Sequence, residues 1–108
     1  MKIKFLTSGE MGFDDFGNPT LATTTVLGSI EIKDENFQDY RKGMEIKIAK
    51  NASFESEVKQ LFLEPVPSFY SDITMQTKLQ ADTEENLYSI LFKKSFDTHS
   101  ELIVMRGN

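Results

Sequence analysis

Residues 87–94 have the sequence Leu87-Tyr88-Ser89-Ile90-Leu91-Phe92-Lys93-Lys94. Apolar residues recur at every second position, as Tyr88, Ile90 and Phe92. A period of two is typical of a half-buried β-strand, because successive side chains point to opposite faces of a sheet. The stretch 73–81 alternates in the same way, and a polar turn at 82–86 separates the two. With a final apolar run at 102–105, they predict an antiparallel meander.

The N-terminal half carries the same signal. Ile3 and Phe5 alternate with lysines, residues 20–33 are rich in β-branched side chains, and residues 53–62 alternate again. We therefore expect three further strands, the second of them bent at Gly28.

One helix is expected between these strands. Asp34 is a suitable N-cap, and Phe37, Tyr40 and Met44 follow at spacings of three and four, which predicts a short helix over about 34–42. Gly43 weakens its continuation, and the residues after it fit a strand as readily as a helix. We therefore expect a mobile segment at about 41–52 that reorders on assembly.

About six strands and one helix in 108 residues leave sheet edges that need protection, and closure into a barrel provides it. The chain is too short for a second core of ordinary size. The sequence thus predicts a mainly β fold with a single domain over 1–108. That domain is a small antiparallel β-barrel with one short inserted helix.

The composition narrows the function classes. The chain has no cysteine and one histidine, which excludes disulfides, thiolate metal sites and sites built from several imidazoles. Its formal net charge of −5 disfavours a protein that grips nucleic acid backbones. No apolar run approaches the roughly 20 residues that span a bilayer, and no signal-peptide core follows Met1. We expect a soluble protein without membrane contact.

The acidic residues near position 14 do not predict a metal site. Together with Glu10 they lack the ligand spacing and the distal glutamate of a calcium-binding loop. A hairpin tip explains them better, since glycine, asparagine and proline favour turns. This tip consists of Asp14, Asp15, Gly17, Asn18 and Pro19.

No catalytic group emerges from the sequence. His99, Asp97 and Ser100 include the residue types of a hydrolase triad, but neighbours on one turn do not reach a common reacting atom. The glycosylation sequon at 51–53 has no secretory signal beside it. We therefore expect no catalytic residue, no metal, no cofactor and no enzymatic activity.

Two groups of aromatic residues are candidates for binding a partner. Phe37, Tyr40 and Met44 would form one stripe on the predicted helix, and such stripes are either core contacts or docking surfaces. Phe69 and Tyr70 follow two prolines, where they would either anchor a loop or contact a partner. Both alternatives are open for each group.

The order of these elements is itself informative. It comprises a short strand, the tip at 14–19, the strand at 20–32, the aromatic segment 36–40, the strand at 53–62, the meander at 75–94 and the ending 96–104. In the meander, the strand Tyr88-Ser89-Ile90 precedes an acidic turn and a final apolar strand. This order resembles the head–tail joining proteins of tailed bacteriophages, also called head-closure or stopper proteins. The Pro- and aromatic-rich segment 64–72 and the polar segment 47–56 depart from the family pattern.

The resemblance implies a non-enzymatic head–tail connector in the neck of the virion, made in the bacterial host cytoplasm. Such a protein assembles as a ring under the portal, retains the packaged DNA and provides the docking surface for the tail. Its partners would be the portal or adaptor protein and tail proteins, with DNA only as non-specific cargo, and the isolated chain would be a monomer. The alternatives are a tail-completion or tail-terminator protein, and a small β-barrel adaptor that binds a cellular partner.

Overall fold

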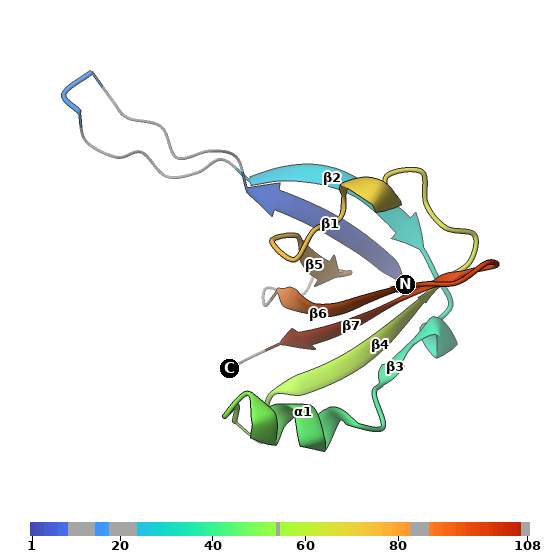
Figure 1. The fold of residues 1–108 in the computed structure, drawn as a ribbon. Helices are drawn as coiled ribbons and strands as arrows, with labels where there is room; N and C mark the ends of the chain where they lie inside the picture. Colours follow the sequence, from blue (N-terminus) through green and yellow to red (C-terminus); the bar gives the residue numbers. More distant parts are fainter. Residues whose placement is uncertain (9–14, 18–23, 54, 83–86, 107–108) are drawn as a thin grey trace.

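The computed structural model of the chain describes residues 1–8, 15–17, 24–53, 55–82 and 87–106. Figure 1 shows that these residues form mostly β-strands, with one short α-helix. The strands are β1 (Lys2–Ser8), β2 (Thr24–Glu31), β3 (Phe37–Asp39), β4 (Glu57–Leu63), β5 (Lys78–Ala81), β6 (Tyr88–Ser95) and β7 (Ser100–Arg106). The helical elements are the 3₁₀ turns η1 (Asp34–Asn36) and η2 (Tyr70–Asp72) and the α-helix α1 (Gly43–Ala49). The prediction of a mainly β fold with one short helix is confirmed.

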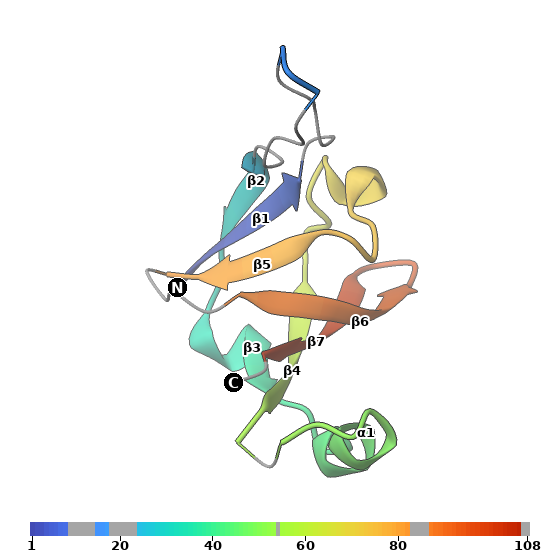
Figure 2. The same ribbon diagram turned by 90° about the vertical axis from the view of Figure 1, so that its left-hand side faces the viewer.

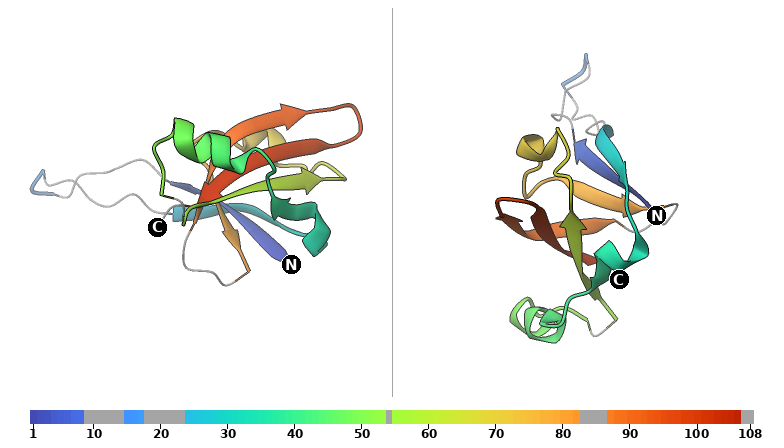
Figure 3. Two further views of the ribbon diagram at one scale, coloured as in Figure 1. Left: turned by 90° about the horizontal axis from the view of Figure 1, so that it is seen from below. Right: turned by 90° about the vertical axis from the view of Figure 1, so that its right-hand side faces the viewer.

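The seven strands form one antiparallel sheet in the order β2-β1-β5-β6-β7-β4-β3. Its two end strands, β2 and β3, are consecutive in the chain, and only residues 32–36 join them. Such a link spans at most about 20 Å, so the sheet curls until its ends lie near each other. Figures 2 and 3 show this curl. No ladder joins β2 to β3 in the described residues, so hydrogen bonds do not complete the predicted barrel.

The inner face of the curled sheet holds the core. Tyr88 of β6 and Phe37 of β3 meet there in a T-shaped contact, with ring centroids 5.3 Å apart, although two strands separate them in the sheet. Burial of each such side chain stabilises the fold by about 1.5–3 kcal/mol. The buried members of the cluster are Ile3, Phe5, Phe37, Leu61, Leu63, Ile73, Leu79, Ala81, Tyr88, Ile90, Leu102 and Val104.

An irregularity in β6 changes which of its side chains face the core. Ile90 pairs with Val104, and both are buried in the core cluster, whereas the next paired residue, Phe92, lies opposite Ile103. Leu91 is the extra residue, and a bulge of this kind shifts the alternation by one position. Phe92 therefore lies on the outer face and is 48% exposed, although its spacing from Tyr88 and Ile90 predicted a shared face.

The predicted helix over about 34–42 is wrong in its position. Asp34 begins only the 3₁₀ turn η1, and Phe37 then enters β3, where it pairs with Leu61. The α-helix begins at Gly43, whose backbone lies so close to β4 that an added Cβ would be 3.2 Å from the Cβ of Val58. Contacts with β4 thus decide that residues 37–39 form a strand and that the helix begins only at Gly43, although local helix propensity favours the opposite arrangement.

Candidate partner-binding surface

The described residues contain no cluster of side chains that could hold a metal ion. No group of three or more acidic or histidine side chains gathers among them. His99 is stacked between the rings of Phe62 and Phe96, with centroids 4.5 and 4.7 Å away, while Ser100 is buried. The Nε2 atom of His99 is 3.6 Å from a carboxylate oxygen of Glu101. Within the same residues, no helix has the length and hydropathy needed to cross a bilayer.

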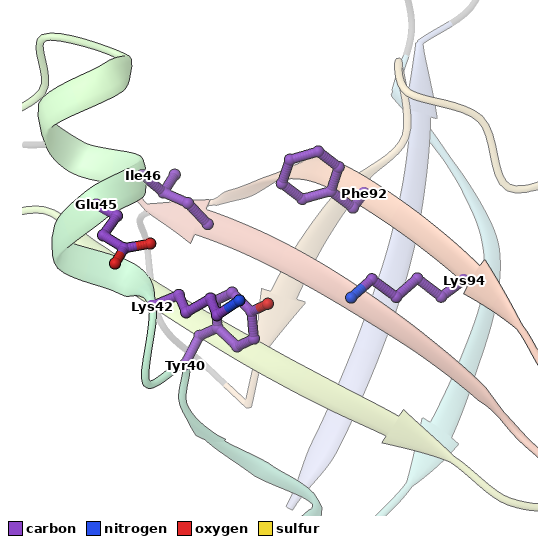
Figure 4. Close-up of a pocket in the computed structure, with 6 residues that line it drawn as sticks. All are labelled: Tyr40, Lys42, Glu45, Ile46, Phe92 and Lys94. Atoms are coloured by element: carbon purple, nitrogen blue, oxygen red, sulfur yellow. The ribbon is translucent and has the colours of Figure 1, made fainter.

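A hollow on the outer face lies between α1 and β6, and we call it the outer groove. Its volume is about 260 Å³, and it is lined by Tyr40, Lys42, Glu45, Ile46, Phe92 and Lys94. Figure 4 shows Ile46 and Phe92 on opposite sides of this space, with the Lys94 side chain extended toward Tyr40 and Lys42. The groove is therefore lined by two apolar side chains, Ile46 and Phe92, and by charged side chains, of which two are lysines and one is Glu45.

Three local features build the groove. The β6 bulge turns Phe92 to the outer face. Tyr40 extends the β3–β4 ladder by one hydrogen bond, since its amide donates to the Val58 carbonyl at 2.9 Å. The Gly43 amide donates to the Tyr40 carbonyl at 2.9 Å, and this turn sets α1 against β4. The position of α1 over the outer face thus follows from backbone contacts.

The predicted stripe of Phe37, Tyr40 and Met44 is not formed, because no helix contains all three residues. Phe37 is only 5% exposed and belongs to the core, where the Lys59 ammonium lies 5.4 Å from its ring centroid. Tyr40 lines the outer groove, and Met44 is 51% exposed on α1. Of this group, only Tyr40 and Met44 are therefore placed to contact a partner.

Phe69 and Tyr70 anchor their loop to the sheet. The Phe69 ring forms a T-shaped contact with Phe5, at 5.2 Å between centroids. The Tyr70 hydroxyl donates to the Lys94 carbonyl at 3.3 Å, and the Lys93 ammonium lies 4.4 Å from the Tyr70 ring centroid. These contacts favour the loop-anchor alternative for both residues.

The predicted hairpin tip lies only partly within the described residues. Asp15 and Gly17 are exposed in a turn, and Gly17 has a φ of 80°, a conformation that favours glycine. Phe16 between them is 90% exposed. Asp14, Asn18 and Pro19 lie outside the described residues.

Sequence reasoning missed most of the groove. Ile46 fell in the stretch that fitted helix and strand equally, and Lys42 and Lys94 resembled ordinary surface charges. For Phe92 one signal existed, since the consecutive apolar residues Ile90, Leu91 and Phe92 break the alternation where the bulge occurs.

Comparisons of the chain with protein-family models, with curated protein sequences and with solved structures find no match.

Proposed function

We propose that the chain is a head–tail connector of a tailed bacteriophage, which forms a ring under the portal, retains the packaged DNA and offers a docking surface to the tail. The observation that carries the proposal is the order of strands in which the sequence resembles this family. The described residues form these strands as β1, β2 and β4 to β7. The aromatic segment 36–40 gives no support, since it contains β3 rather than a helix.

The surface chemistry supports a protein that acts through assembly. Several large apolar side chains remain exposed on different elements, among them Phe16, Ile48 and Phe92. Phe92 lines the outer groove together with Ile46, and apolar side chains that gather on a protein surface often mark contacts with other proteins. The net charge of −5 suits the wall of a channel for DNA, since like charges prevent tight contacts with phosphates.

Deletion of the gene from the phage or prophage genome that encodes it tests the proposal. We expect heads without attached tails, from which the packaged DNA leaks, and full recovery when the gene is supplied in trans. Electron microscopy and nuclease-resistant DNA measure the two effects. Closed, DNA-filled heads beside defective free tails would favour the tail-completion alternative instead. Normal yields of infectious, tailed particles would overturn the proposal.

A further inference from the structure

We propose that the outer groove binds residues 64–67 of a second copy of the chain. These residues, Glu64-Pro65-Val66-Pro67, follow β4 and are called the proline loop below. The inference rests on the proposed function, because it names the contact between neighbouring subunits of the ring.

The charges of the chain are unevenly distributed. Residues 41–50, which contain α1, carry four basic side chains and one acidic one, a formal charge of +3. Since the whole chain has a charge of −5, the other residues carry −8. Arg41 and Lys42 are exposed and make no ion pair with any described residue. The groove itself is lined by Lys42 and Lys94 beside Glu45, a formal charge of +1. It is therefore a positive site on an acidic protein, and acidic surfaces of other copies are attracted to it.

The proline loop has the complementary chemistry. Glu64 is exposed, and it lines one hollow together with the exposed Glu31 of β2. Val66 is 40% exposed between two prolines. The loop thus presents the exposed Val66 side chain and the exposed Glu64 carboxylate, which is opposite in charge to the Lys42 and Lys94 ammonium groups of the groove. The Glu31 carboxylate lies 3.9 Å from the N-terminal ammonium group. The groove, with Ile46 and Phe92 on its two sides, has room for the Val66 side chain.

The loop is held in shape before it binds. The Tyr70 amide donates to the Pro67 carbonyl at 3.0 Å, and the Phe69 ring is fixed against Phe5. Proline also restricts the φ of two of the four loop residues. Little conformational entropy is therefore lost on docking, which favours the proline loop over a flexible segment as the occupant.

The groove and the loop of one copy do not meet. No residue of the proline loop lines the groove. The α1 side of the groove adjoins the first residues of β4, because α1 packs on Val58, whereas the loop follows Leu63 at the other end of that strand. Lys94, on the β6 side, is in register with Phe62 through Glu101 and extends away from the loop, toward Tyr40 and Lys42. A strand of this length separates its ends by roughly 20 Å. Figure 1 shows α1 and the end of β4 in different parts of the molecule. Two different surfaces thus meet in a head-to-tail contact, the kind that closes into rings.

Charge reversal of each surface tests the contact with the purified chain alone. The groove variant is Lys42→Glu with Lys94→Glu, and the loop variant is Glu31→Lys with Glu64→Lys. Sedimentation at about 1 mM protein and low salt measures association, since a contact with a Kd near 1 mM is then substantially formed. We expect weak, salt-sensitive association of the wild type and at least about tenfold weaker association of either variant alone.

An equimolar mixture of the two variants should associate again, because each altered groove then meets an altered loop of the other variant. Combination of all four substitutions in one chain should restore association in the same way. As a control, Lys4→Glu with Lys78→Glu changes the net charge as much as the groove variant does, at positions that lie outside residues 41–50 and line neither surface. It should weaken association less.

Three results would overturn the inference: a wild type that stays monomeric at this concentration, variants that associate like the wild type, and a mixture that remains dissociated. Circular dichroism of each variant shows whether it is folded, and the mixture and the four-fold variant provide rescue that misfolded chains cannot give. If the charge-reversal pattern is found while gene deletion leaves virions intact, the proposed function fails and the contact stands.

Discussion

Phe69 lies directly over Gly28 of β2, and its ring occupies the space that a side chain at position 28 would need. The same ring contacts Phe5 of β1. Phe69, in the loop between β4 and β5, therefore covers both β1 and β2 at this end of the sheet. Glycine at position 28 is therefore required by the close approach of Phe69.

Replacement of Gly28 by alanine should lower the free energy of unfolding by about 1–3 kcal/mol, because the added methyl group displaces a packed ring. Urea denaturation measures the loss, and Ser29→Ala on the same strand serves as the control. In a Phe69→Ala background the same glycine substitution should cost little. An equal cost in both backgrounds would show that the ring does not restrict this position.

Phe37 and Tyr40 should respond differently to alanine, although their spacing suggested a common role. Phe37→Ala removes a core ring and should cost about 3–5 kcal/mol of stability. Tyr40→Ala, at the rim of the groove, should leave the fold largely intact. Denaturation of the two single variants separates these effects, and a small loss for Phe37→Ala would contradict its assignment to the core.

Lys93 fastens the loop between β4 and β5 to the end of β6. Its ammonium group donates to the Tyr70 carbonyl at 3.0 Å and to the Ile73 carbonyl at 2.8 Å. Lys93→Met keeps the aliphatic stem but leaves both carbonyls without this donor, and should cost about 1–3 kcal/mol. Lys94→Met, one residue further along the strand, is the matched control and should change stability much less. Equal losses would argue against a specific role of the Lys93 ammonium.

His99 should contribute to stability and to no chemical step. It lies between the Phe62 and Phe96 rings, and aromatic contacts of this kind are worth about 0.5–1.5 kcal/mol each. We expect His99→Ala to lower the melting temperature while assembly is retained, and His99→Phe to recover part of the loss. Assembly that fails with unchanged folding would reveal a role in contact with a partner.

The strands could be predicted from the sequence because alternation and burial agree along most of the sheet. Ile3 and Phe5, for example, alternate with lysines in the sequence and are fully buried in the structure. The three consecutive apolar residues at 90–92 break the alternation, but they do not show which of them faces the core. The outward orientation of Phe92 became evident only from its pairing with Ile103. Outer-face residues are assigned to the wrong face when such a bulge is missed.

The helix was misplaced for a different reason. Asp34 and the spacing of Phe37 and Tyr40 satisfy helical rules, but Phe37 gains more from burial between β4 and Tyr88 than a short exposed helix could provide. Gly43 is a poor helix former, yet it is the residue that lets α1 approach Val58. The candidate groove depends on both outcomes, since it lies between α1 and the part of β6 beyond the bulge.

The short link between β2 and β3 also governs which changes of chain length the protein tolerates. Ile32 exchanges two backbone hydrogen bonds with Met1, at 2.9 and 3.0 Å, so the link is already pinned to the first strand. Each inserted residue would add up to about 3.5 Å of reach and let the two ends of the sheet move apart. Insertions between residues 32 and 36 should therefore be selected against, while evolution remains free to exchange the exposed side chains there.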